Sequence, residues 1–167
     1  MSESLKIDSS IYMWLVVIVF ITPVIITIIS EFIFTKRITL KISGLVVMIM
    51  VAVTTVLAYQ VQETKVEITN EKLVLSSTFY SSEVLLRDIK LVESFEKELP
   101  LKYHLVQRSN GISLPSYFAG YFKTHDKSDS FVIATSPPYL VVTSNDSDLL
   151  IFSGSDTVKD ALLKANK

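Results

Sequence analysis

The chain of 167 residues contains no cysteine, two histidines and four glycines. Without cysteine, no catalytic thiol or cysteine-ligated metal site is available. The two histidines, His104 and His125, are too far apart to form an HExxH motif, and His125 falls in a polar turn. The few glycines do not form a phosphate-binding loop. The sequence therefore predicts neither enzymatic activity nor a cofactor.

Acidic side chains offer one alternative, a metal or acid–base site made of Glu93, Glu96 and Glu98. In an extended strand, alternate side chains point to opposite faces, so only Glu96 and Glu98 share a face. Next to Lys97, at the end of a predicted strand, these acids are more simply explained as solvated charges. We therefore predict no metal site.

Two long stretches, 11–30 and 42–59, contain no Asp, Glu, Lys or Arg. A helix needs about 20 apolar residues to cross a bilayer, and a buried core helix rarely runs so long without charge. A cleaved signal peptide is disfavoured because residues 1–10 carry Glu3 and Asp8 against Lys6 alone, and such peptides begin with a basic segment. We predict a two-helix transmembrane hairpin over residues 1–60, with both stretches crossing the lipid bilayer.

The short connection between these stretches carries Lys36, Arg37 and Lys41. Positive residues are enriched on the cytoplasmic side of membrane proteins, so these three are the expected topology determinants. With this turn in the cytoplasm, both termini lie on the other side. The sequence thus predicts a multi-pass protein of the cell membrane with an extracytoplasmic C-terminal domain.

Residues 61–167 have the composition of a separate domain, with frequent charges and apolar runs of strand length. Turn residues separate the predicted strands, which suggests an antiparallel sandwich or a partly open barrel. We expect these strands at 65–69, 72–77, 83–86, 89–95, 117–123, 131–135, 139–143 and 149–152. A helix follows from Ser155 or Asp156, with Val158, Ala161 and Leu162 on one apolar stripe. This helix is expected to cap the barrel.

One segment resembles a known family. It reads Arg108-Ser109-Asn110-Gly111, then Leu114-Pro115-Ser116-Tyr117, followed by Gly120 and Phe122. It is similar to a stretch of small bacterial membrane-anchored pleckstrin-homology (PH) domains, although Ser116 stands where that pattern often has glycine. The resemblance covers about residues 66–165. It implies an all-β, antiparallel PH-like barrel with a C-terminal capping helix, preceded by two spans.

The longest part of this domain without a clear hydrophobic periodicity is 102–115, and long irregular segments often carry function. The side chains of this segment can offer both apolar contacts and directed hydrogen bonds. The predicted binding residues are Tyr103, His104, Arg108, Asn110, Gly111, Leu114 and Pro115. Gly111 and Pro115 also have an architectural explanation, because glycine and proline shape turns.

The charge balance limits the choice of partner. From residue 61 onward, acidic residues outnumber basic ones, so the domain has no polybasic surface for anionic lipid or nucleic acid. We therefore predict a membrane-anchored, non-catalytic binding or scaffold module that recognises a protein or a small component of the cell envelope. The alternatives are a lipid-headgroup or small-ligand sensor and a structural subunit of a membrane complex.

Overall fold

The computed structural model describes residues 2–4, 9–36, 40–62, 64–146 and 148–165. The chain divides into two compact units. The helical unit comprises Asp8–Gln62, and the sheet unit combines Met1–Ile7 with Glu63–Lys167. A few N-terminal residues thus belong to the same unit as the C-terminal domain.

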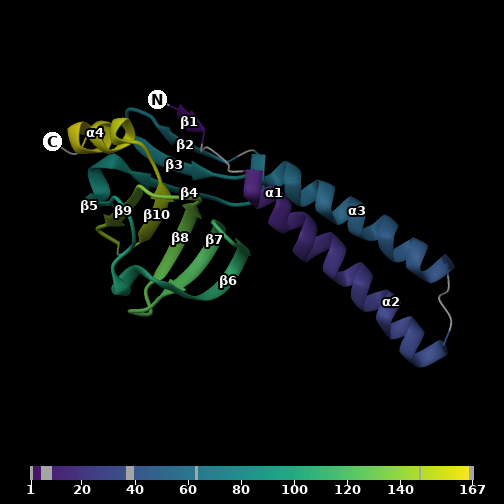
Figure 1. The fold of residues 1–167 in the computed structure, drawn as a ribbon. Helices are drawn as coiled ribbons and strands as arrows, with labels where there is room; N and C mark the ends of the chain where they lie inside the picture. The colour runs from purple at the N-terminus through teal and green to yellow at the C-terminus, as the bar shows by residue number, and fades with distance from the viewer. Residues whose placement is uncertain (1, 5–8, 37–39, 63, 147, 166–167) are drawn as a thin grey trace. The chain divides into compact units, whose positions relative to one another are not determined.

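The helical unit begins with one continuous helix made of α1 (Ser9–Leu15), a π-helical segment η1 (Val16–Ile21) and α2 (Thr22–Thr35). Thr22 donates both its N–H and its hydroxyl to the Val17 carbonyl, the hydroxyl over 2.8 Å. The wider π turn lies directly before Pro23, which has no N–H to donate. Helix α3 (Leu40–Gln62) lies beside α2 (Figure 1), and the Ser43 hydroxyl donates to the Glu31 carboxylate over 3.0 Å.

The prediction of a two-span hairpin is wrong. Among the described residues, only Ser9–Thr35, with 27 residues, is long and apolar enough to cross a membrane. The apolar part of α3 is the shorter Ser43–Tyr59, whereas a span needs about 20 residues. The absence of charge over 42–59 does not by itself provide an apolar helix of full spanning length. The helix Ser9–Thr35 supports membrane association.

The sheet unit contains two sheets (Figure 1). The small sheet has the strand order β1-β2-β3-β4 and is antiparallel throughout. Its strands are β1 (Ser2–Ser4), β2 (Lys65–Ile68), β3 (Lys72–Ser76) and β4 (Ser81–Leu85). The large sheet has the order β5-β9-β10-β8-β7-β6. Its strands are β5 (Ile89–Phe95), β6 (Leu105–Leu114), β7 (Tyr117–Thr124), β8 (Asp129–Ala134), β9 (Tyr139–Ser144) and β10 (Leu149–Ser153).

The predicted PH-like antiparallel barrel is also wrong, because the described strands form two open sheets and no closed barrel. The large sheet is not purely antiparallel either. Strand β10 lies between β8 and β9, parallel to β8 and antiparallel to β9. Strand spacing along the chain predicts eight of the ten described strands and misses β1 and β6, and it does not predict that β10 is inserted between β8 and β9.

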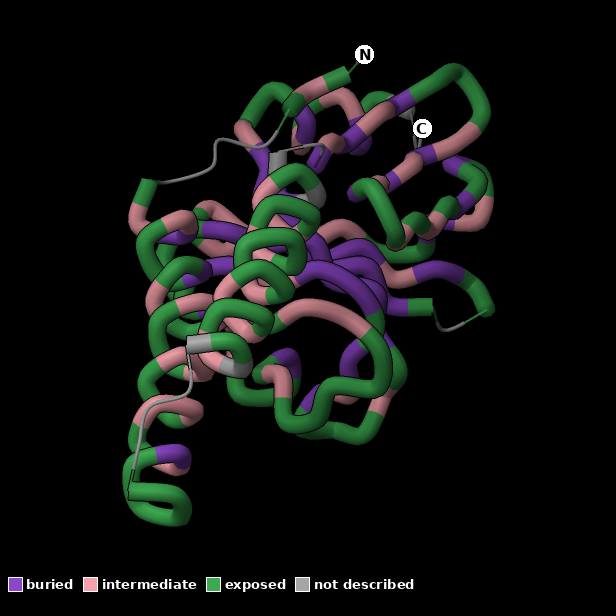
Figure 2. Tube along the Cα trace, turned by 90° about the vertical axis from the view of Figure 1, so that its right-hand side faces the viewer, coloured by how far each residue is buried: buried purple, intermediate pink, exposed green. Residues whose placement is uncertain are grey.

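The main core lies between the facing sides of the two sheets, where buried residues concentrate in Figure 2. Leu73 of β3 and Ile133 and Phe152 of the large sheet are completely buried there. The predicted C-terminal helix is confirmed as α4 (Asp156–Ala165), which contacts β2 and β5. Its apolar stripe buries Val158 and Leu162 in the same core.

A second apolar cluster covers the opposite, outer face of the large sheet. Val132, Val141 and Ile151 project there from the central strands, and Tyr103 packs on them from a short 3-10 turn, η3 (Leu101–Tyr103). Central strands are therefore buried on both faces, and all five residues of β10 are buried. This outer cluster is incomplete at one end, where a pocket opens.

Candidate functional site: a pocket on the outer sheet face

The outer-face pocket has a volume of about 440 Å³. Its floor comes from the large sheet and its roof from the segment that connects β5 to β6. The ten lining residues are Lys97, Glu98, Leu99, His104, Leu105, Phe118, Val132, Ala134, Tyr139 and Ile151. Its volume lies within the range of about 300–1,000 Å³ that is usual for small-molecule sites, and its lining is mainly apolar.

The sheet register explains why the floor is hollow. Phe118 of β7 pairs with Ala134 of β8, and Val132 of β8 pairs with Ile151 of β10, so these four side chains lie on adjacent strands. Ala134 is the only one of the four without a large side chain. The small methyl group leaves unfilled space between larger neighbours. The small side chain of Ala134 therefore contributes to the hollow in an otherwise bulky row.

The roof of the pocket is anchored to strand β5. The Tyr103 hydroxyl donates a hydrogen bond to the Glu93 carboxylate, and the Lys102 ammonium lies 3.4 Å from the same carboxylate. That ammonium also lies 4.2 Å from the centroid of the Tyr103 ring. Burial, together with the hydrogen bond to Glu93, raises the pKa of Tyr103, so this hydroxyl keeps its proton. The β5–β6 connection is thus fixed to the sheet by side chains.

Polar groups at the pocket are few. The His104 ring donates from Nε2 to the Leu99 carbonyl over 2.8 Å, which fixes the ring in the roof. Lys97 and Glu98 are exposed lining residues of opposite charge. Tyr139 lines the pocket as well, and burial raises the pKa of its hydroxyl. The lining is mainly apolar, as is usual for a binding pocket.

The predicted binding residues do not form one cluster. His104 lines the pocket, and the buried Tyr103 holds its roof. The other five lie along β6 and the turn that follows it. Arg108 and Asn110 are exposed, and Asn110 accepts a hydrogen bond from the Tyr80 hydroxyl over 3.4 Å.

The end of the β6–β7 hairpin is architectural. Gly111 pairs with Gly120, Leu114 is buried, and the exposed Pro115 precedes Ser116, whose φ of 63° allows the tight turn. The irregular segment that the sequence predicted at 102–115 is therefore mostly strand. Its pairing with β7 shifts register between Leu105 and Gln107 and again between Arg108 and Asn110. Such bulges interrupt the alternation on which strand prediction depends.

Sequence reasoning missed the pocket floor. Phe118 and Ala134 come from the consecutive strands β7 and β8, and Ile151 comes from β10, which the strand order places next to β8. Their apolar character indicates burial but not which face they occupy. No local signal marks Ala134, because one alanine in a buried strand is common. Topology was needed to find the site.

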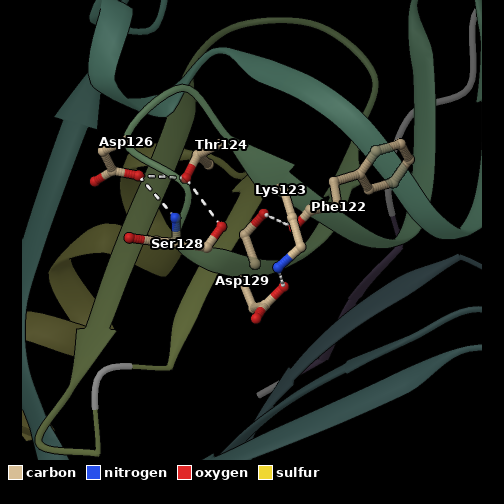
Figure 3. A network of polar contacts seen from close by, with 7 residues as sticks. Phe122, Lys123, Thr124, Asp126, Ser128 and Asp129 are labelled. Carbon is tan, nitrogen blue, oxygen red and sulfur yellow. Dashed lines mark hydrogen bonds and ion pairs between the residues drawn. The ribbon is translucent and has the colours of Figure 1, made fainter.

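The turn between β7 and β8 carries a network of polar contacts (Figure 3). Asp126 accepts from the Thr124 hydroxyl over 2.5 Å and from the Ser128 N–H over 3.1 Å, and these bonds lower its pKa. Lys123 and Asp129 form an ion pair of 2.8 Å across the turn. These contacts are internal to the hairpin, so the cluster stabilises the turn. Within the described part of the chain, no group of three or more His, Cys, Asp or Glu residues could hold a metal ion.

No protein-family model, curated protein or solved structure matches this chain. The similarity to PH domains therefore stays an expectation from the sequence. Any functional proposal must rest on the pocket, the exposed strand edge and the apolar helix.

Proposed function

We propose that the protein is a membrane-associated, non-catalytic binding module whose outer-face pocket receives an apolar group from a small component of the cell envelope. The pocket of about 440 Å³ carries this proposal, because a concave, mainly apolar site with few polar groups is typical of ligand binding. Its roof is fixed by the contacts of Tyr103 and His104, which favours a preformed site. This geometry favours a sensor of small ligands.

A protein partner is the second candidate, and strand β6 supports it. It is an edge strand of the large sheet, and residues 106–110 are all exposed, with Val106 at 58%. An exposed edge can pair with an extended segment of another chain. The two bulges in β6 oppose such pairing, because they interrupt the regular row of backbone groups. We therefore place the small ligand first.

Strand pairing and charge both bear on the orientation. Strand β1 pairs with β2, so residues 2–4 and the two sheets belong to one compact unit. Of the three predicted topology determinants, Lys36 and Lys41 are exposed, and Arg37 lies outside the described residues. The extracytoplasmic position of the C-terminal domain stays a prediction from these charges.

Site-directed photocrosslinking tests the pocket. A benzophenone amino acid at Lys97, on the pocket rim, should form adducts in cells. The same group at Asn145, at the other end of β9 from Tyr139, should not. Adding Ala134→Phe, which fills the floor, should remove the Lys97 adduct, whereas Ala134→Ser should preserve it. The adduct mass separates a small molecule from a protein. Equal adducts at both positions, or an adduct insensitive to Ala134→Phe, would refute the pocket as the binding site.

A further inference from the structure

The pocket floor is elongated across the large sheet. Phe118, Ala134, Ile151 and Tyr139 come from β7, β8, β10 and β9, which are consecutive neighbours in the strand order. Adjacent strands lie about 4.8 Å apart, so a floor spanning four strands extends over about 14 Å. A volume of about 440 Å³ distributed over that length describes a narrow groove. An extended chain fits this shape better than a compact ring system does.

The polar rim does not select a charged ligand. Lys97 and Glu98 contribute one charge of each sign, and His104 already donates its Nε2 proton to the Leu99 carbonyl. Recognition must then come from the apolar floor, through burial of hydrocarbon surface. Each buried methylene contributes about 0.8 kcal/mol, so an alkyl chain gains affinity along its whole length.

We propose that the outer-face pocket holds the alkyl chain of an amphiphile and leaves the polar head at the rim beside Lys97 and Glu98. The inference rests on the proposed function, because it assigns a ligand class to the same pocket. The apolar helix Ser9–Thr35 associates the protein with a membrane, where such chains are abundant. Two sources share this chemistry: a free fatty acid, and an acyl chain of a bilayer lipid.

Photolabelling of the full chain in dioleoylphosphatidylcholine nanodiscs tests the inference. One arm adds free decanoic acid with a photoreactive diazirine at the chain end, and the other incorporates a phospholipid carrying the same modified chain. Labelled peptides are then mapped by mass spectrometry. We expect label on the peptides containing Leu99, Leu105 and Ala134, from the free acid, the phospholipid or both. Helix Ser9–Thr35 is the internal reference, because a membrane helix should be labelled in every sample.

Variants make the result specific. Ala134→Phe should reduce pocket labelling at least tenfold relative to the helix, and Ala134→Ser should leave it unchanged. If Ala134→Phe has a lower melting temperature than the natural chain, Leu99→Trp is used in its place, because it fills the pocket from the roof. Label confined to the helix, or pocket label that survives both filling variants, would overturn the alkyl-chain assignment. If the Lys97 crosslink is still lost in Ala134→Phe while no alkyl label reaches the pocket, the proposed function stands and only the ligand class is wrong.

Discussion

Leu162→Asp should unfold most of the sheet unit. Leu162 lies on α4 with no exposed surface, inside the core that joins both sheets. Removing a buried leucine alone costs about 2–5 kcal/mol. An aspartate at this site would add the cost of burying a polar or charged group without a partner. Because domains are stable by only about 5–15 kcal/mol, the sum is comparable with the whole stability.

The neighbouring residue provides a matched control. Leu163 belongs to the same helix but is 43% exposed, so Leu163→Asp should change the stability by about 0.5 kcal/mol or less. The measurement is thermal unfolding of the full chain, followed by the strand signal in circular dichroism. Leu162→Met, which conserves volume, should remain folded. If Leu162→Asp melted like Leu163→Asp, α4 would not be an integral part of the core.

This helix was predictable from sequence because its information is local. The apolar stripe of Val158 and Leu162 has helical spacing, and both side chains are buried as the stripe requires. Several strands were predictable for the same reason. The strands expected at 65–69 and 72–77 are found as β2 and β3. Hydrophobic periodicity and turn residues are properties of short segments, so they can be recognised without knowledge of the fold.

The closure of the barrel and the position of the pocket depended on non-local information. Barrel closure was wrong because it depends on strand order, and β10 inserts between β8 and β9. The outer-face pocket was missed because Phe118 and Ala134 become neighbours only through register. The binding role of His104 and Arg108 stays a prediction, and only His104 lies at the pocket. Candidate sites formed by a sheet face therefore require the topology, whereas candidate sites on a turn can be suggested by sequence alone.

The second large effect is expected from Gly120→Ala, which should detach β6 from β7. Gly120 has φ +122°, a conformation that side-chain-bearing residues rarely adopt. A Cβ there would lie 2.4 Å from the Asn110 carbonyl oxygen and 2.6 Å from the Gly111 Cα. Both are backbone atoms of the paired strand, so no side-chain rotation relieves the clash. Strain of this kind costs about 1–3 kcal/mol from the backbone conformation alone, before the clash is counted.

Position in the sheet determines where the damage should appear. Strand β6 is at the sheet edge and pairs with β7 alone, so it can separate while the core between the two sheets persists. We expect amide hydrogen exchange at 105–114 to accelerate at least tenfold, with little change in β10. Gly44→Ala is the control, because the added Cβ would meet nothing within 4 Å beyond its chain neighbours and the nearby backbone of its own helix, and alanine is favoured in helices. Since Leu105 begins β6 and lines the pocket, loss of this pairing should also weaken pocket photolabelling. Unchanged exchange in β6 would mean that the two strands can move apart at the glycine pair without losing their ladder.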